Sequence, residues 1–126
     1  MKTLRVVASI IEKDNKILIA QRLKGEFAGL WEFPGGKIEP EESKEHAIIR
    51  EIKEEFDTEI NIEKYLKTIE HQYDSFYLIM DCFVCSIKSG DLTLHDHLAY
   101  RWIDPKEDNI DWVPADVKVI EAYLNK

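Results

Sequence analysis

The chain has 126 residues, of which 44% are hydrophobic and 33% charged, a balance typical of one folded domain with a sizeable core. Its formal net charge of −8 excludes a general nucleic-acid-binding surface, because polymer binding needs a basic footprint. The apolar run at 6–11 is too short for a signal sequence or a membrane span. We therefore expect a single cytoplasmic domain over residues 1–126, with neither nucleic-acid polymer nor membrane as partner.

The beginning of the chain predicts a β-hairpin. Residues 3–12 are rich in β-branched side chains, and Asp14 and Asn15 form a turn signal before a second apolar stretch at 16–22. A flexible loop follows at 24–30. These features predict two antiparallel strands and then a loop.

The segment 30–37 leads out of this loop and ends with two glycines followed by a lysine. At Gly35 and Gly36 the backbone can approach a metal ion or a phosphate closely, because no side chain intervenes. Trp31 and Phe33 fit the core of the domain, and they also fit the wall of a binding pocket.

The stretch 43–57 predicts an amphipathic helix. Ser43 suits the N-cap position. Ile48, Ile52 and Phe56 recur at the i, i+4, i+8 spacing of a stripe that can be buried. We expect this stripe to dock the helix on a sheet.

Three glutamates share the neighbouring face of this helix. Glu51, Glu54 and Glu55 stand at i, i+3 and i+4, and their mutual repulsion would weaken an isolated helix by a few tenths of a kcal/mol per pair. A hard divalent cation would remove that repulsion, since Mg²⁺ prefers carboxylate and carbonyl oxygens. The face is therefore a candidate metal site.

This part of the chain resembles the Nudix box, written G-x5-E-x7-R-E-U-x-E-E-x-G-U, where U is a bulky apolar residue. The pattern is filled at the required spacing by Gly36, Glu42, Arg50, Glu51, Ile52, Glu54 and Glu55. It departs at the end, where Asp57 replaces a glycine that normally supplies a left-handed helix stop, and Thr58 replaces an apolar residue. On this motif the chain is identified as a member of the Nudix family, in its MutT-like group.

The resemblance implies a fold and a set of metal ligands. The fold is an α/β/α sandwich with a mixed, curved sheet, the box helix on one side and the C-terminal helix on the other. Residue patterns alone indicate an α+β domain with a β-rich middle. The implied cofactor is Mg²⁺, with Mn²⁺ as a substitute, held by the Gly36 carbonyl and by Glu51, Glu54 and Glu55.

The middle of the chain predicts two long strands, at 59–73 and 75–88, around a turn at Asp74. Cys82 and Cys85 form a C-x-x-C inside the second strand, where their side chains point to opposite faces. No second pair exists to complete a zinc site. We expect two buried free thiols.

The segment 92–103 carries two histidines, His95 and His97, which could line one face of a strand. Two ligands without a third do not make a zinc site. Asp96 stands six residues before Trp102, and this resembles the family's loop carboxylate, which implies a general base or an extra metal ligand. The alternative for Asp96 is a turn-capping role.

Residues 114–124 predict the closing helix, with Pro114 in its first turn. We expect Val117, Ile120 and Leu124 to pack inward, with Val119 and Tyr123 beside them. Asp116 resembles the family position that contacts the nucleobase. An ionised carboxylate only accepts hydrogen bonds, which suits the exocyclic amine of cytosine. The alternative for Asp116 is a favourable first-turn charge at the helix N-terminus.

The resemblance also assigns catalytic and substrate contacts. The catalytic residues it implies are Glu51, Glu54, Asp96 and Arg50. Arg50 is expected to pair with a box carboxylate and fix its orientation. Either Asp96 or a box glutamate is the general base. The substrate contacts implied, besides Asp116 and a pocket role of Phe33, are phosphate contacts by Arg22 and Lys37. The alternative for Arg22 is a solvated charge at a strand end.

The expected reaction is hydrolysis of a nucleoside triphosphate to a monophosphate and diphosphate. Cytosine nucleotides (CTP, dCTP or 5-modified dCTP) are the favoured substrates. An 8-oxo-dGTP diphosphatase that cleans the nucleotide pool and so contributes to DNA repair is the enzymatic alternative. A catalytically silent nucleotide sensor is the alternative outside enzymes, and the complete set of box glutamates argues against it. We expect a small nucleotide as ligand and a monomer or homodimer.

Overall fold

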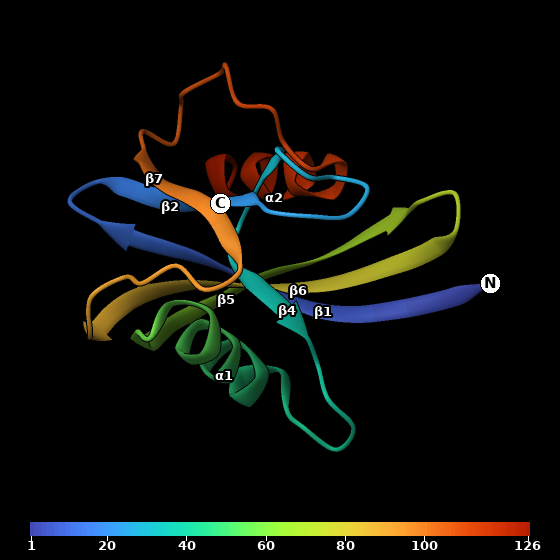
Figure 1. The fold of residues 1–126 in the computed structure, drawn as a ribbon, viewed down its shortest axis with the longest axis horizontal. Coiled ribbons are helices and arrows are strands. Elements are labelled where there is room, and N and C mark those ends of the chain that lie inside the picture. The colour runs from blue at the N-terminus through green and yellow to red at the C-terminus, as the bar shows by residue number, and fades with distance from the viewer.

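The computed structural model describes residues 1–126 and contains seven strands and two helices (Figure 1). In chain order they are β1 (Lys2–Lys13), β2 (Lys16–Arg22), β3 (Trp31–Glu32), β4 (Gly35–Lys37), α1 (Lys44–Phe56), β5 (Glu59–Gln72), β6 (Phe76–Ser89), β7 (His97–Ile103) and α2 (Pro114–Leu124). The predicted opening hairpin, the two long middle strands and both helices are confirmed.

The strands form one mixed sheet in which β1 is central. β1 pairs in parallel with β6, from Lys2 beside Phe76 to Ile11 beside Cys85. β5 pairs antiparallel with β6, and β4 pairs antiparallel with β1. β2 continues from β1 through the hairpin and pairs with β3 and β7. The short β4 therefore lies beside β1 and places its glycines close to the start of α1.

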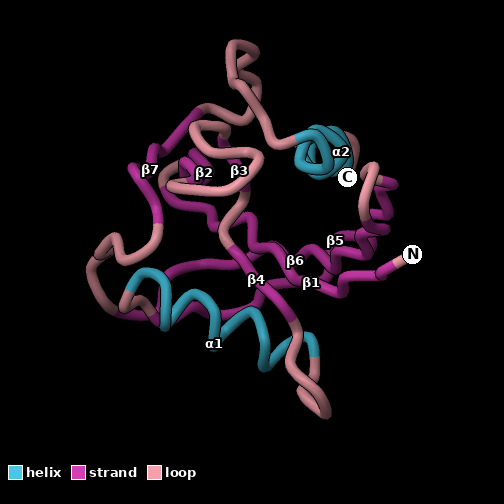
Figure 2. The backbone as a smooth tube through the Cα atoms, turned by 45° about the vertical axis from the view of Figure 1, so that its right-hand side comes forward, coloured by secondary structure: helices cyan, strands magenta, loops and turns pink.

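The two helices cover opposite faces of the sheet, as Figures 1 and 2 show. α1 buries Ile48, Ile52 and Phe56 in one apolar cluster with β1, β2 and β6. α2 buries Val119 and Tyr123 in a second cluster on the other face. The α/β/α sandwich with a mixed sheet is confirmed.

Both ends of α1 are capped by side chains or backbone in the expected places. The Ser43 hydroxyl accepts a hydrogen bond from the His46 backbone N–H at 3.1 Å. Asp57 takes the left-handed conformation that glycine usually takes, with φ 53°, and its N–H donates to the Lys53 carbonyl. Thr58 is fully buried, and its hydroxyl donates to the Phe56 carbonyl at 3.0 Å. The two departures from the box pattern thus preserve the helix end.

The buried face of α2 differs from our prediction. Val117 and Leu124 are 41% and 48% exposed, whereas Ala115 and Asp116 are buried together with the inward-facing Val119. Ile120 is buried as predicted, but the apolar spacing alone also placed Val117 and Leu124 inward. Because Asp116 is fixed inward by a hydrogen bond to backbone, the helix turns its 115–119–123 side to the sheet and its 117–124 side to solvent.

The two cysteines lie on opposite faces, as predicted. Cys82 belongs to the cluster under α2 and Cys85 to the cluster under α1, and both are free and buried. Burial raises the pKa of both thiols, that of Cys85 to about 12. They are therefore unreactive core residues.

Neither helix is long and apolar enough to cross a membrane.

Candidate active site

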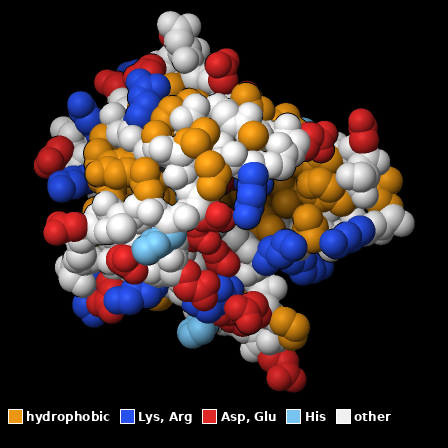
Figure 3. All heavy atoms as spheres, viewed as in Figure 1, with side chains coloured by type: hydrophobic (Ala, Val, Ile, Leu, Met, Phe, Trp, Pro, Cys, Tyr) orange, Lys and Arg blue, Asp and Glu red, His pale blue; other side chains and the backbone are white.

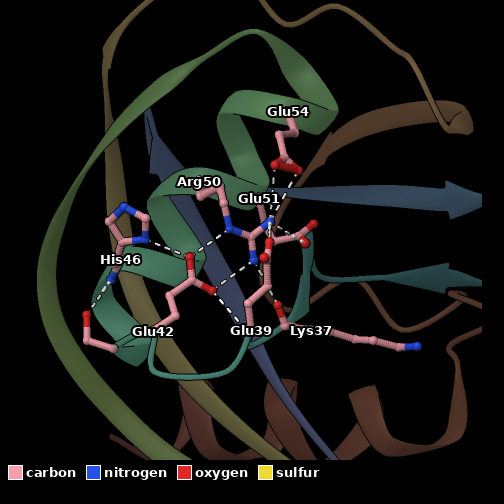
Figure 4. Close-up of polar contacts among 8 residues, drawn as sticks. Lys37, Glu39, Glu42, His46, Arg50, Glu51 and Glu54 are labelled. Carbon is pink, nitrogen blue, oxygen red and sulfur yellow. Dashed lines mark hydrogen bonds and ion pairs between the residues drawn. The ribbon is translucent and has the colours of Figure 1, made fainter.

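The centre of the Nudix box is one arginine surrounded by carboxylates (Figure 4). Arg50 donates through Nε and Nη2 to the two oxygens of Glu42, at 2.7 and 3.0 Å. Its Nη1 lies 3.1 Å from Glu51 Oε1 and 3.2 Å from the Glu54 carboxylate, and Nη2 reaches the Lys37 carbonyl at 3.0 Å. The guanidinium thereby offsets the repulsion between the glutamates and ties α1 to the end of β4.

Glu42 is the fixed partner of this arginine. Besides Arg50, its carboxylate accepts from the Glu39 N–H at 3.0 Å and contacts His46 Nδ1 at 2.6 Å. The bidentate hydrogen bonds from Arg50 lower the pKa of Glu42 to about 2. Glu42 therefore stays ionised and orients Arg50. The contact with His46, in the first turn of α1, was not predicted from the sequence.

Besides its contact with Arg50, Glu51 borders the glycine segment, and Glu55 lines the pocket beside it. A Cβ atom built on Gly36 would lie 2.2 Å from Glu51 Cδ, so the Glu51 carboxylate occupies the space that the glycine leaves open. Glu55 Oε2 is buried without a hydrogen-bond partner. Burial is the main cause that raises the pKa of both groups. A buried acceptor without a donor is costly unless a cation or a ligand satisfies it.

The carboxylates of Glu51 and Glu55 and the carbonyl of Gly36 are suitable ligands for a hard divalent cation, because such ions prefer carboxylate and carbonyl oxygens. The three glutamates of the predicted face do not, however, converge into a preformed cluster of three ligands. Glu54 turns to Arg50, while Glu55 points toward the loop before β7 and interacts with the charge of Asp96.

A pocket of about 500 Å³ opens beside these carboxylates. Glu51, Glu55 and Asp96 line it on the side of α1, and Phe33 and Asp116 line it at the base of α2. Figure 3 shows acidic side chains gathered near the centre of this face. The pocket is also lined by the cationic side chains of Arg22, Lys24 and Lys37.

Asp96 lies at the open side of the pocket. Its side chain is 51% exposed, and Oδ1 lies 3.9 Å from Lys24 Nζ. Its negative charge contributes to the raised pKa of Glu55. Asp96 is therefore near enough to the box helix to act with it, and open enough to meet a ligand.

A hydrogen-bonded trio of Arg22, Glu32 and His97 was not predicted from the sequence. Glu32 accepts from Arg22 Nη1 at 2.9 Å, and its other oxygen lies 2.9 Å from His97 Nε2. The His97 ring stacks on Phe56 at 5.4 Å. Arg22 is thus paired with an acid at the strand end rather than free in solvent. It still reaches the pocket.

His95 has a separate partner, because its Nε2 lies 2.8 Å from the Asp57 carboxylate. It precedes β7, whereas His97 begins that strand. The two histidines therefore serve two different carboxylates instead of one shared ligand.

Asp116 closes the far end of the pocket. Its Oδ2 accepts a hydrogen bond from the Phe33 backbone N–H at 2.8 Å, and the residue is only 5% exposed. Burial raises the pKa of Asp116 well above its ordinary value, and Glu32 adds to that effect, while the Phe33 N–H and Arg22 oppose it. Asp116 stands in the first turn of α2 and lines the pocket.

Aromatic side chains complete the pocket, and two of them, Phe27 and Tyr73, were not predicted from the sequence. Phe27, at the tip of the loop after β2, lies against Tyr73 with ring centroids 5.2 Å apart. The Tyr73 hydroxyl accepts from the Ala115 N–H at 2.9 Å. Phe33 packs from the core side and stacks on Trp112. The signal available in the sequence was only the presence of aromatics at loop tips.

Comparison with known proteins agrees with this fold and box. The family model described as a NUDIX domain matches residues 6–122. The CTP pyrophosphohydrolase of Escherichia coli (strain K12) is 38% identical, covering 98% of this chain and 93% of the relative. The 8-oxo-dGTP diphosphatase of Proteus vulgaris is 36% identical, covering 73% of this chain and 84% of the relative.

A solved structure gives the same result for the fold. The solution structure of the E. coli ORF135 protein superposes with a TM-score of 0.85 at 37% identity, covering 99% of this chain and 91% of that one. The chain belongs to the Nudix family and is a Nudix hydrolase. Hydrolases of this family generally need a divalent metal ion.

Proposed function

We propose that this chain is a Mg²⁺-dependent pyrophosphohydrolase of cytosine nucleoside triphosphates, which converts CTP, dCTP or a 5-modified dCTP and water to the monophosphate and diphosphate. The observation that carries this proposal is that one pocket joins the box carboxylates to the buried carboxyl of Asp116. The similarity to the E. coli CTP pyrophosphohydrolase supports it. Residues 1–126 would form the single catalytic domain.

The metal would be held by Glu51, Glu54 and Glu55 with the carbonyl of Gly36. When bound, Mg²⁺, or Mn²⁺ in its place, withdraws negative charge from phosphate oxygens and makes a phosphate more open to attack. Arg50 contributes by position, because its hydrogen bonds to Glu42, Glu51 and Glu54 fix the carboxylates before substrate arrives.

The phosphate side of the pocket carries the remaining chemistry. Arg22 and Lys37 line it and would bind phosphate oxygens, Arg22 from an orientation that Glu32 already fixes. Asp96, exposed at the mouth and close to Glu55, would accept the proton of the attacking water. The water forms the new P–O bond at an internal phosphate, and diphosphate leaves with the electrons of the broken P–O bond.

The end of the pocket that contains Asp116 favours cytosine when the Asp116 carboxyl group is ionised. The Phe33 N–H occupies Oδ2, which leaves Oδ1 as the oxygen available to a ligand. An ionised carboxylate offers only acceptors, and the N4 amine of cytosine is a donor at a matching edge. Phe33, stacked on Trp112 under the pocket, would contact the base as an apolar surface.

The 8-oxo-dGTP diphosphatase activity is a second candidate, and the raised pKa of Asp116 favours it. A protonated carboxyl group both donates and accepts, as an amide does, and so matches the mixed edge of an oxidised guanine. The relative from P. vulgaris bears that activity in its name. The two candidate functions therefore require different protonation states of the Asp116 carboxyl group.

The test is diphosphate release with Mg²⁺ across CTP, dCTP, 5-methyl-dCTP, dGTP, 8-oxo-dGTP, ATP and UTP. We expect the cytosine nucleotides to have the highest kcat/KM and Glu51→Gln to abolish most turnover while the protein stays folded. A preference for 8-oxo-dGTP would replace the first candidate with the second. Folded protein that releases no diphosphate from any of them would overturn both and leave a binding role.

A further inference from the structure

The helix that carries Asp116 begins without a side-chain cap of its own. Val113 occupies the N-cap position and makes no side-chain hydrogen bond. The first N–H groups of a helix need partners from outside the helix. Here the Ala115 N–H donates to the hydroxyl of Tyr73 at 2.9 Å, across 42 positions of sequence. A tyrosine from the β5–β6 hairpin therefore serves as the cap of α2.

Tyr73 is itself held in place by its surroundings. Its backbone N–H donates to the Phe76 carbonyl at 2.9 Å, which closes the hairpin. Its ring lies 4.5 Å from His71, 4.9 Å from Phe76 and 5.2 Å from Phe27, measured between centroids. Because the Tyr73 ring is packed against these three rings, its hydroxyl is held in a fixed position to accept the hydrogen bond.

The capped N–H and the base-contacting carboxyl belong to adjacent residues. Ala115 is bound by Tyr73, and Asp116 is bound by the Phe33 N–H. The first turn of α2 is thus held at two points by two residues, Tyr73 and Phe33, that both line the pocket. Loss of either contact would let this turn shift, and small shifts of a positioning group reduce specific recognition strongly.

We propose that Tyr73 is a positioning residue for nucleobase discrimination, because its hydroxyl caps the first turn of α2 and so fixes Asp116 in the pocket. The inference rests on the proposed role of Asp116 in base recognition. Tyr73 acts here through the helix end and not through the phosphates, so its hydroxyl governs the choice between bases more than the rate of the chemical step.

The variant Tyr73→Phe removes the hydroxyl and keeps the ring. Tyr77→Phe is the matched control, because Tyr77 lies on the same hairpin and its hydroxyl donates to exposed Glu70, away from the pocket. We expect Tyr73→Phe to reduce the ratio of kcat/KM for the preferred over the disfavoured base by about tenfold, mostly through KM. The ratio should stay unchanged in Tyr77→Phe.

Two further measurements separate this inference from the proposed function. In the Asp116→Ala background Tyr73→Phe should change the ratio no further, because no hydrogen-bonding side chain remains at position 116 for Tyr73 to position. Amide hydrogen exchange, which needs no substrate, should become at least about tenfold faster at Ala115 and Phe33 in Tyr73→Phe than in Tyr77→Phe.

The outcomes are distinct. If exchange at Ala115 and Phe33 is the same in both variants, or if Tyr73→Phe lowers kcat/KM equally for all bases, the positioning role is wrong. If exchange accelerates while the wild-type protein shows no base preference at all, Tyr73 still caps α2, but base recognition by Asp116 is wrong and the discrimination role falls with it.

Discussion

The backbone N–H of Phe33 donates to the Asp116 carboxylate over 2.8 Å, although the two residues are 83 positions apart in the sequence. Phe33 stands three residues before Gly36, whose backbone lies against the carboxylate of Glu51. A single short segment thus touches both ends of the pocket. The proposed base contact at Asp116 is thus connected through Phe33 and Gly36 to the box carboxylate of Glu51, and this connection makes Asp116 the most informative residue to change.

Asp116→Asn should alter base preference without unfolding the protein. The amide oxygen can still accept from the Phe33 N–H, and the amide nitrogen adds a donor that the ionised acid lacks. We expect the ratio of kcat/KM for CTP over 8-oxo-dGTP to fall by about tenfold or more, measured by diphosphate release. An unchanged ranking of nucleotides would show that this side chain does not contact the base.

Asp116→Ala is the contrasting variant. It leaves the Phe33 N–H without its partner in a buried place, which costs about 1–3 kcal/mol of folding free energy. Urea unfolding should therefore separate the two substitutions, with the alanine variant clearly less stable than the asparagine variant. Equal stability of the two would mean that the hydrogen bond contributes little.

Asp116 should also make stability depend on pH. Burial raises its pKa in the folded state above the ordinary value of about 3.9, with Glu32 adding and Arg22 opposing. A raised folded pKa means that the folded state holds the proton more tightly than the unfolded chain does. The contribution of Asp116 to stability is therefore complete below the ordinary pKa and is lost as pH rises through the raised one.

The measurement is the free energy of unfolding from pH 4 to pH 9 for the wild type and Asp116→Asn. We expect the wild type to lose stability relative to the variant as pH rises, and the difference to level off once the carboxyl is ionised. Parallel curves for the two proteins would contradict a raised pKa at this position.

The two neighbouring glycines predict opposite results for the same substitution. A Cβ on Gly35 would lie 1.9 Å from the Val7 carbonyl oxygen, which is backbone of the central strand and has little freedom to move. A Cβ on Gly36 would meet the Glu51 carboxylate at 2.2–2.5 Å, the end of a flexible side chain. Gly35→Ala should therefore lower stability by a few kcal/mol, because overpacking costs about 1–3 kcal/mol or more.

Gly36→Ala should instead keep most of the stability and lose activity, because Glu51 moves aside from the place where it would bind metal. We expect at least about tenfold lower kcat/KM, with a thermal midpoint close to that of the wild type. Each glycine variant is the control for the other. If Gly36→Ala keeps full activity, the position of Glu51 beside Gly36 is not the productive one.

The box helix could be predicted from sequence because its signals are local. The Ser43 cap and the Ile48–Ile52–Phe56 stripe lie within a few residues of the helix they define, and both are confirmed. The left-handed stop at Asp57 was not predicted, because Asp57 replaces the box glycine. Even Asp57 could replace glycine, since Asp is one of the few residues that tolerates the left-handed region.

The remaining parts of the site depend on contacts between distant segments. Glu32 and His97 meet across 65 positions, and Tyr73 reaches Ala115 across 42. Neither pair produces a periodic or spaced pattern in the sequence. The prediction that Val117 and Leu124 pack inward was wrong for the same reason, because the contact that sets the rotation of α2 joins Asp116 to the distant Phe33.

Arg50→Lys should lower activity although it keeps the positive charge. An ammonium group cannot bind Glu42 through two parallel hydrogen bonds while also reaching Glu51, Glu54 and the Lys37 carbonyl. Residues that orient metal ligands typically contribute about 10–100-fold to activity, and we expect a loss in that range.

Lys53→Ala is the matched control for Arg50→Lys, because Lys53 lies on the same helix and makes only an exposed ion pair with Glu59. Its kcat/KM should stay within about twofold of the wild type. An Arg50→Lys protein as active as the Lys53→Ala protein would mean that the carboxylates need no guanidinium to hold them.

Glu55→Gln should make the metal-free protein more stable and less responsive to metal. Glu55 Oε2 is buried without a hydrogen-bond partner, and its charge is disfavoured by burial and by nearby Asp96. A neutral amide removes that unfavourable charge, so we expect the thermal midpoint measured in EDTA to rise. The same change removes a hard ligand, so the stabilisation by added Mg²⁺ or Mn²⁺ should shrink, because binding to the folded state stabilises according to affinity.

Glu45→Gln, in the exposed first turn of α1, should respond to metal as the wild type does. A Glu55→Gln protein that is less stable in EDTA and equally stabilised by Mg²⁺ would exclude Glu55 as a metal ligand and require another partner for its buried oxygen.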